Sequence, residues 1–387
     1  MRSLFVFCAG VGGMIGCDWI AARSFTNEAV AEWMIVKSLV LFLGVMLTLG
    51  FERCFLRIPQ SAPHILKFSV LNVAMLAPLI FVVLMFALSD VLLGLWVTFA
   101  SVGLALSIAY SEKLRAAQRM ALAQAALNGW KIVLVALFAT KVMFGLGIEP
   151  PEMTLMATLS VAGLFSWGIA RGVRESGEGI EYRKLLADAR FFLLFNLLLV
   201  ATSYADQFIV GLVLAGPAAR SYLAHATLFL APFLFVAAFL GFQLAPRLRN
   251  RDIAKFVNPV IVIGSAIGLL ILSVAVLAAL GPAAMLLLYG EAVPFEFTIA
   301  ALMAAVGVFR IMYAIPSAVL GVLGSQAELR RFLAINVGLF VAQIGLTALL
   351  LIFEMPAVLA ILLPCLMHWV GKSTQGVYQS WSVLRPS

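Results

Sequence analysis

Charged residues are scarce in this sequence of 387 residues: aspartate, glutamate, lysine and arginine together make up only 11% of it. Charged residues make up about a quarter of a soluble domain, because its surface must stay hydrated. Hydrophobic residues account for 64% of the chain. The composition therefore excludes a soluble globule and predicts that much of the apolar surface faces lipid.

Cysteine is also rare, with four residues, no Cys-x-x-Cys pair and no Cys/His cluster of metal-ligand spacing. The sequence thus predicts no disulfide framework, no metal site and no other cofactor. Cys17 follows Met-Ile-Gly, which loosely matches a lipoprotein cleavage site. Because one apolar run after another follows it, a first transmembrane helix is the favoured interpretation.

The sequence contains no Walker phosphate-binding loop, no Gly-x-Ser-x-Gly elbow and no His-Glu-x-x-His pair. The chain is therefore not expected to hydrolyse ATP itself or to act as a hydrolase or metalloprotease. The predicted outer loops are short and hold few acidic or histidine residues, unlike those of membrane transferases. We predict that the protein is not an enzyme.

Long apolar runs make up most of the chain. A helix needs about 20 apolar residues to cross a bilayer core of about 30 Å. This length predicts an all-α polytopic membrane protein with about twelve transmembrane helices, near residues 3–22, 30–50, 66–88, 91–110, 121–143, 153–171, 190–213, 222–245, 257–280, 297–323, 331–352 and 356–377.

The basic residues, which give a net charge of +8, gather in alternate loops. Lysine and arginine are enriched in cytoplasmic loops, so this pattern sets the orientation. With a cytoplasmic N-terminus, 20 of the 26 basic residues lie inside: Arg2, Arg53, Arg57, Lys67, Lys113, Arg115, Arg119, Arg171, Arg174, Arg183, Lys184, Arg190, Arg247, Arg249, Arg251, Lys255, Arg330, Arg331, Lys372 and Arg385. We predict a bacterial inner-membrane protein with both termini in the cytoplasm, and no nucleic-acid partner.

The longest polar segment divides the chain into two halves. The predicted N-lobe is 1–171 with spans one to six, the linker is 172–189, and the C-lobe is 190–387 with spans seven to twelve. The stretches that begin at Asp18 and Asp206 match: each continues with a polar–aromatic pair and then Leu-Gly-Phe before Glu52 or Gln243, at an offset of 188–191 residues. Halves with an even number of spans insert in the same sense, which predicts a parallel repeat.

Charged residues at bilayer depth are candidates for function, because burying a charge there is costly. Arg310 lies midway along the tenth predicted span and keeps its charge. Pro316 follows it and predicts a kinked helix. Arg310 either binds an anionic group in a water-filled cavity or forms a buried pair with Asp18 or Asp206.

Three further residues are candidates, and two of them allow two interpretations each. Lys131 is either at mid-depth in the fifth span or, with Trp130, an anchor at the interface. Asp18 and Asp206 would bind a coupling cation or proton as repeat-related carboxylates. Alternatively, Asp18 forms a structural pair with Lys37 on the next span.

Other polar residues in the spans are interpreted as packing groups. His225 and His368 are expected to be packed side chains and not proton relays. The predicted hydrogen-bond partners between helices are Gln207, Gln243, Asn128 and Asn196.

Several stretches together resemble one transporter group over about a third of the chain. Residues 22–57, ARSFTNEAVAEWMIVKSLVLFLGVMLTLGFERCFLR, resemble the second-span region of polysaccharide flippases of the multidrug/oligosaccharidyl-lipid/polysaccharide exporter superfamily. Residues 204–248 are similar to the start of that family's second half, and residues 286–295 with 321–332 to its ninth-to-eleventh span region.

The resemblance implies a MATE-like fold of two six-helix lobes in a V around a central cavity. It implies a flippase that moves a polyprenyl-pyrophosphate-linked oligosaccharide between leaflets by alternating access, for cell-surface polysaccharide synthesis. Arg310, Lys131 and Lys37 would neutralise the pyrophosphate, while Asp206 and Asp18 would couple transport to H⁺ or Na⁺. Membrane lipids and polysaccharide-assembly proteins are the further partners it implies.

Three alternatives remain. A multidrug or cation antiporter of the same superfamily is disfavoured by a cavity that contains Arg310. A membrane glycosyltransferase, polymerase or ligase would be expected to carry a long periplasmic loop with catalytic residues. The third alternative is a scaffold of a polysaccharide-assembly complex that transports nothing.

Overall fold

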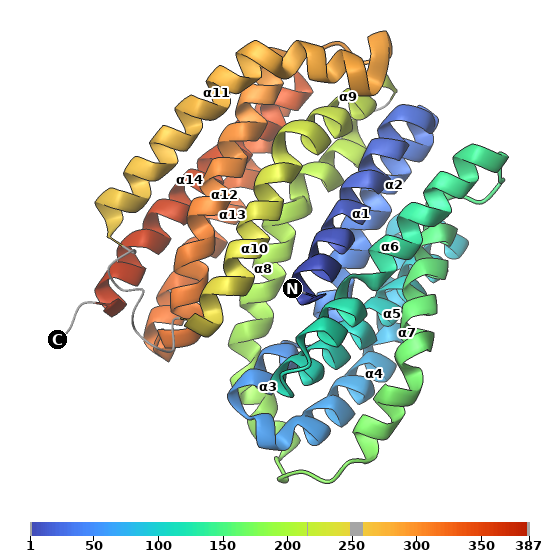
Figure 1. Ribbon diagram of the computed structural model, residues 1–387, viewed down its shortest axis with the longest axis vertical. Coiled ribbons are helices and arrows are strands. Elements are labelled where there is room, and N and C mark those ends of the chain that lie inside the picture. The colour runs from blue at the N-terminus through green and yellow to red at the C-terminus, as the bar shows by residue number, and fades with distance from the viewer. Residues whose placement is uncertain (1, 215, 248–257, 385–387) are drawn as a thin grey trace. The chain divides into compact units, whose positions relative to one another are not determined.

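The computed structural model describes residues 2–214, 216–247 and 258–384, and all regular secondary structure in these ranges is helical (Figure 1). Twelve of the described helices are long and apolar enough to cross a membrane. The prediction of an all-α chain with twelve spans is therefore confirmed. The predicted basic residues Arg249, Arg251, Lys255 and Arg385 lie outside the described residues, as do the side chains of Arg57, Gln243 and Arg247.

The chain folds into two compact units, Met1–Leu212 and Val213–Ser387. The helices of the first unit are α1 (Arg2–Ser24), α2 (Asn27–Leu47), the short η1 (Phe51–Arg53), α3 (Cys54–Arg57) and η2 (Pro59–Ser61), then α4 (Ala62–Leu88), α5 (Val91–Ala116), α6 (Met120–Phe144), α7 (Pro150–Arg174) and α8 (Tyr182–Val213). In this unit α5 is central, since α2, α4, α6 and α7 all pack against it.

The second unit is built around α12. Its helices are α9 (Pro217–His225), the π turn η3 (Ala226–Leu230), α10 (Ala231–Arg247), α11 (Pro259–Tyr289), the short η6 (Gly290–Ala292), α12 (Phe297–Leu323), α13 (Gln326–Ile352) and α14 (Ala357–Leu384). The segments α9, η3 and α10 follow one another without a break and act as one span. Against α12 pack α10, α11 and α14, while α13 packs against α14.

The packing order recurs in the two halves of the sequence. In both, the fourth span contacts the second, the third and the sixth, and the fifth contacts the sixth. Thus α5 and α12, the fourth spans of their halves, occupy equivalent central places. This recurrence supports the internal repeat that the sequence suggests.

Local sequence signals set where the spans begin. Asp90 accepts hydrogen bonds from the backbone N–H groups of Leu92 and Leu93 and so starts α5. Ser325 and Glu328 form a reciprocal capping box at the start of α13. Such caps satisfy N–H groups that the first helical turn leaves without partners.

The structure differs from the sequence prediction at the segment 172–189. Helix α7 extends to Arg174 and α8 begins at Tyr182, so only the seven residues 175–181 connect them. The first turns of α8 are amphipathic: Lys184 is exposed, whereas Leu185 and Ala189 are fully buried against a cluster that includes Phe51 and Phe55. The buried face makes this stretch a helix, although its average composition is polar. Helix α8 belongs to the first compact unit, whereas the sequence division placed the seventh span in the second half.

A stripe of glycines brings α1 close to α6. A Cβ atom at Gly10 would lie 2.3 Å from the Cβ of Asn128, and one at Gly13 would lie 2.8 Å from the carbonyl oxygen of Lys131. Gly12, on the other side of the helix, has no such neighbour within 4 Å. Small residues at this spacing allow helix backbones to approach closely in a membrane.

We expect Gly13→Ala to lower the stability of the protein by about 1–3 kcal/mol, because the added methyl group overpacks a backbone contact. Gly12→Ala adds the same methyl group at a position that has open space. It is expected to be neutral or stabilising by up to about 1 kcal/mol, since alanine favours the helix. Thermal unfolding midpoints of the purified proteins in detergent measure the difference. Equal midpoints for the two variants would show that the α1–α6 contact is not tight.

Candidate functional site

Six acidic or basic side chains are buried in the described part of the chain: Asp18, Lys37, Glu52, Asp206, Arg310 and Lys372. All except Glu52 lie within the candidate membrane spans. Burying a charge is costly unless other groups compensate it. The compensating groups therefore indicate which of these residues serve stability and which are available for other roles.

Arg310 and Lys372 in the second unit pack on one aromatic ring. The guanidinium carbon of Arg310, midway along α12, lies 4.6 Å from the ring centroid of Trp369 on α14. The Nζ atom of Lys372 lies 4.7 Å from the same ring and 4.7 Å from that of Tyr313. We call Arg310, Tyr313, Trp369 and Lys372 the cationic–aromatic cluster.

Neighbouring helices hold this cluster in place. Phe332 of α13 stacks on Tyr313, with ring centroids 6.1 Å apart and an angle of 10° between the planes. His368 packs edge-on against Trp369. Ser373 donates a hydrogen bond of 2.6 Å to the carbonyl oxygen of Phe309, which ties α14 to α12. Contacts among α12, α13 and α14 thus hold the side chains around the two cations.

The electrostatic setting of the cluster is positive. The helices from α9 to α14 contain two acidic residues, Glu291 of the short η6 and Glu328 in the first turn of α13. Two like charges near one ring repel each other strongly in a medium of low dielectric constant. Contact with an aromatic face compensates a desolvated cation by about 2 kcal/mol. An anionic group bound to both cations would be stabilised further.

Lys372 was counted with the cytoplasmic basic residues in the sequence analysis, and the structure shows that it is buried within a candidate span. Helix α14 continues to Leu384, which places Lys372 well inside the helix, where its side chain is only 1% exposed. A sequence signal was present: Tyr313 follows Arg310 by three residues, and Lys372 follows Trp369 by three. Residues three apart lie on one face of a helix, so each helix offers a cation and a ring together.

In the first unit, Asp18 and Lys37 form a buried ion pair. The Asp18 Oδ1 atom accepts hydrogen bonds of 2.7 Å from Lys37 Nζ and of 2.7 Å from Trp33 Nε1. Of the two interpretations of Asp18, the pairing with Lys37 is the observed one. Binding of a substrate by Lys37 would require this pair to break, and breaking a buried pair costs about 3–5 kcal/mol.

Lys131 lies near the middle of its helix, because α6 begins at Met120. This position agrees with the mid-depth interpretation and not with the interfacial anchor. Its Nζ atom donates to Asn128 Oδ1 at 2.8 Å, and Asn128 Nδ2 donates to Gln124 Oε1 at 2.7 Å. Asn128 was predicted to bond between helices. Its side chain instead bonds along α6, since residues three and four apart lie on one face.

One sequence candidate remains. Asp206 lies on α8 in the first unit and is 1% exposed. Four of the five sequence candidates, Asp18, Lys37, Lys131 and Asp206, therefore belong to the first unit, and only Arg310 belongs to the second. The described contacts bring Asp18 and Lys37 together but include none between Lys37 and Lys131.

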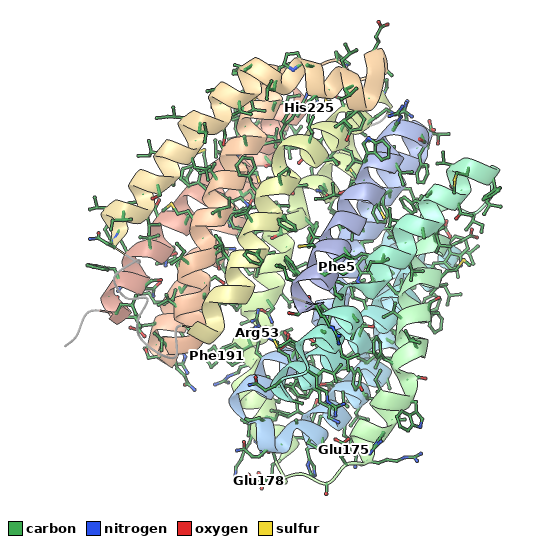
Figure 2. The ribbon with its side chains drawn as sticks, viewed as in Figure 1. Phe5, Arg53, Glu175, Glu178, Phe191 and His225 are labelled. Atoms are coloured by element: carbon green, nitrogen blue, oxygen red, sulfur yellow. The ribbon has the colours of Figure 1, made fainter. Side chains whose placement is uncertain are left out.

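His225 is a packing group, as predicted. Its Nε2 atom accepts a hydrogen bond of 3.0 Å from the backbone N–H of Glu296, so the hydrogen is assigned to Nδ1, which donates to the carbonyl oxygen of Ser221 at 2.8 Å. The ring thereby fastens α9 to the N-terminus of α12 (Figure 2). Both ring nitrogens are occupied by backbone groups, which leaves no free position for a proton relay.

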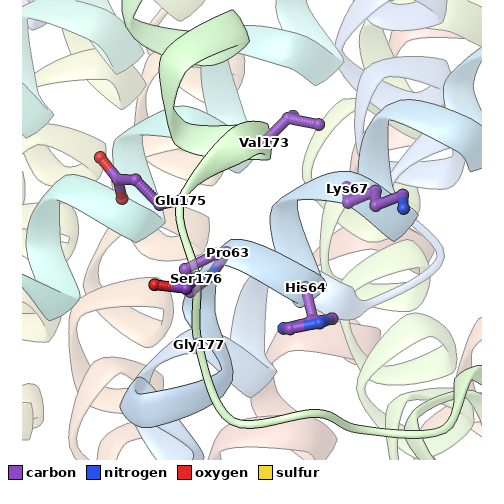
Figure 3. A pocket seen from close by; sticks show the side chains of 7 residues that line it. All are labelled: Pro63, His64, Lys67, Val173, Glu175, Ser176 and Gly177. Atoms are coloured by element: carbon purple, nitrogen blue, oxygen red, sulfur yellow. The ribbon is translucent and has the colours of Figure 1, made fainter.

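A shallow pocket of about 330 Å³ lies at helix ends in the first unit (Figure 3). Pro63, His64 and Lys67 of α4 line one side, and the other side is lined by Val173, Glu175, Ser176 and Gly177. Glu175, at its rim, pairs with Lys113 at 2.5 Å. None of the buried charged residues lines this pocket, so it is separate from the candidate site.

No protein-family model matches the chain, and no curated protein sequence matches it. Solved membrane transporters share its fold. An inward-facing multidrug resistance MATE family transporter of the MOP superfamily superposes with a TM-score of 0.62 at 15% identity, over 99% of this chain and 97% of that one. An outward-facing transporter with the same family description gives a TM-score of 0.61 at 12% identity, over 99% and 96%.

A third similar structure is a MOP superfamily transporter from Pyrococcus furiosus, described as having a binding pocket whose reverse polarity suggests a different function. It gives a TM-score of 0.61 at 14% identity, over 100% of this chain and 96% of that one. These likenesses cover nearly the whole chain. They show that the chain has the MATE-type fold.

We expect the Asp18–Lys37 pair to be coupled in stability. Lys37→Met alone leaves the Asp18 carboxylate buried without its cation and should destabilise the protein by about 3–5 kcal/mol. The double variant Asp18→Asn with Lys37→Met contains no buried charge here and should be more stable than Lys37→Met. Unfolding midpoints of wild type, both single variants and the double variant form the cycle that measures this. Additive effects would show that the pair does not stabilise the fold.

Proposed function

We propose that this chain is a membrane transporter of the MATE type whose substrate carries a phosphate anion. Its substrate class would be a polyprenyl-pyrophosphate-linked oligosaccharide, moved from the cytoplasmic to the periplasmic leaflet of a bacterial inner membrane. Both termini would lie in the cytoplasm, as the basic loops suggest. The observation that carries this proposal is the cationic–aromatic cluster of the second unit.

The cluster suits a pyrophosphate group. Arginine offers a planar fork of donors that matches phosphate oxygens, and lysine adds a second, compact charge. Arg310 and Lys372 lie 4.6 Å and 4.7 Å from the centroid of one ring, so two cations are held near each other. The interaction is strong because the surroundings are apolar and the cations are desolvated. The polyprenyl chain needs no protein site, since it remains in the bilayer.

The fold supports transport by alternating access. Proteins of this fold are described in inward-facing and outward-facing conformations, which are the two end states of such a cycle. The sequence has no Walker loop, so the energy would come from an H⁺ or Na⁺ gradient. Of the two carboxylates suggested by sequence for coupling, Asp206 and Asp18, the latter is already bound to Lys37.

The second candidate is multidrug antiport, which the descriptions of two similar structures favour. The two functions differ in the sign of the substrate charge. A site formed by two cations would repel the organic cations that are typical of multidrug substrates. The transporter with a pocket of reverse polarity indicates that this fold accommodates pockets of different charge.

We expect Arg310→Ala to lower the rate of translocation about 10- to 100-fold, because it removes charge-assisted hydrogen bonds worth about 1.5–3 kcal/mol. The translocation rate of Arg310→Lys should lie between those of wild type and Arg310→Ala, since lysine keeps the charge but lacks the planar set of donors. The assay follows a fluorescent lipid-linked oligosaccharide across the membrane of proteoliposomes. Lys184→Gln, at an exposed position, is the matched control for loss of one positive charge.

Two results would count against the proposal. The first is a correctly folded Arg310→Ala variant that translocates the lipid-linked substrate at the wild-type rate. The second is a wild-type protein that exports a cationic dye and leaves the lipid-linked substrate in place. The second result would support the multidrug antiporter.

A further inference from the structure

Glu52 is a buried carboxyl group that lies outside the membrane-spanning segments. It belongs to η1, the short helix after α2, and its residue is 6% exposed. Gly50 precedes it with a φ of +78°, and a Cβ there would lie 2.5 Å from the backbone nitrogen of Leu193. Glycine therefore allows η1 to lie directly against α8, with the carboxyl group of Glu52 near that contact.

Three residues surround the carboxyl group of Glu52. The Thr48 Oγ1 atom lies 2.6 Å from Oε2, and Asn196 Nδ2 of α8 donates a hydrogen bond to Oε1. Arg53 Nη2 donates to Asn196 Oδ1 at 3.2 Å and so turns the amide group of Asn196 towards Glu52. Asn196 forms the link between helices that the sequence predicts.

The hydrogen atoms in this network point to a protonated carboxyl group. Thr48 Oγ1 also lies 2.7 Å from the carbonyl oxygen of Val45. A hydroxyl group has one hydrogen, so it cannot donate to Val45 and to Glu52 at the same time. If Oε2 of Glu52 carries a proton, it donates to Thr48, and Thr48 donates to Val45. The contacts of Thr48 Oγ1 with the Val45 carbonyl oxygen and with Glu52 Oε2 are then both hydrogen bonds.

The surroundings favour the neutral form as well. Burial raises the pKa of Glu52 above the usual carboxyl range, although the hydrogen bond from Thr48 and the charge of Arg53 oppose this shift in part. The other residues of the buried cluster around η1 are apolar, among them Ile65, Leu66 and Ala109. Its other titratable groups are the thiol of Cys54 and the hydroxyl of Tyr182, which donates to Asn72.

We propose that Glu52 is the carboxyl group that binds the proton coupled to transport, and that Asn196 transmits its protonation state to α8. A proton from water binds to Oε2 and returns to water when the carboxylate forms again. Asp18 is less suited to this role, because it is paired with Lys37. In the second half of the sequence the matching position is Gln243, a neutral amide that cannot titrate.

The two states differ at the contact between η1 and α8. When Glu52 is ionised, Thr48 turns its hydrogen to Oε2, and Asn196 donates to a charged acceptor. Hydrogen bonds to charged acceptors are stronger than neutral ones. Ionisation of Glu52 therefore strengthens its hydrogen bond from Asn196 of α8, while burial disfavours the ionised form as a whole, so the contact between η1 and α8 differs between the two states.

Proton binding at Glu52 is tested without any substrate, by infrared difference spectra of the purified protein between two pH values. We expect the carbonyl stretch of a protonated carboxylic acid to disappear as the pH is raised. The band should be absent in Glu52→Gln and shifted in Thr48→Val, which removes the hydroxyl group but keeps the shape. Glu178→Gln, at an exposed position, should leave the band unchanged. A band that persists in Glu52→Gln would overturn the proposal.

The coupling role rests on the proposed transport function, and a second assay separates the two. In proteoliposomes, an imposed proton gradient should accelerate the wild type at least several-fold and leave Glu52→Gln unaffected. Gradient-independent translocation should remain in Glu52→Gln. Acceleration of Glu52→Gln equal to that of wild type would refute the coupling role. If the wild type moves no lipid-linked substrate, the transport proposal fails, while the infrared result still decides whether Glu52 binds a proton.

Stability against pH gives an independent check. A raised pKa in the folded state means that the folded protein holds this proton more tightly than the unfolded chain. The stabilisation is complete below the usual carboxyl pKa and is lost as the pH rises through the raised pKa of Glu52. Thermal midpoints in detergent should fall over that range in wild type and in Glu178→Gln. The fall of the thermal midpoint with pH should be smaller in Glu52→Gln. A fall equal to that of wild type would contradict the raised pKa of Glu52.

Discussion

The desolvation of charge is the constraint on which the rest of this structure depends. A charge placed among apolar helices must be compensated nearby, and the protein does this in three ways. Asp18 is matched by the opposite charge of Lys37. Arg310 and Lys372 lie on aromatic faces, and Glu52 lies among the neutral hydrogen-bonding groups of Thr48 and Asn196. A matched pair is stable and unreactive, whereas cations on rings can still attract an anion, and a neutral setting lets a carboxyl group gain or lose a proton.

The architecture could be predicted from the sequence because hydropathy depends on averages over about 20 residues. The twelve spans follow from such averages, and single residues hardly alter them. The side-chain environment of one residue depends on which helix face it occupies and on what packs there. Lys372 was therefore counted as a cytoplasmic charge although it is buried on α14. Asn128 was expected to reach another helix, yet its partners lie on its own. The start of α8 was hidden by the polar average of an amphipathic segment.

Fold and chemistry separate clearly in this molecule. The packing order of the helices recurs between the halves, and small residues and caps maintain it. The buried charged groups do not follow the repeat: the buried acidic residues and the ion pair belong to the first unit, and the buried rings with two cations belong to the second. Proteins of one fold can thus bind substrates of opposite charge through differences in a few side chains. Function must therefore be argued from those side chains.

The glycine face of α1 also bears on how the chain is made. Asp18 meets its ion-pair partner Lys37 only 19 residues later, so its charge is matched as soon as the second span has been synthesised. The backbone of Lys131, against which Gly13 packs, emerges far later, with the fifth span. Until the fifth span has been synthesised, the hairpin of α1 and α2 therefore has its buried charge neutralised, while the glycine face of α1 is exposed to lipid. The order of residues along the chain therefore lets the buried charge of Asp18 be paired early, whereas the glycine face of α1 is covered by α6 only later.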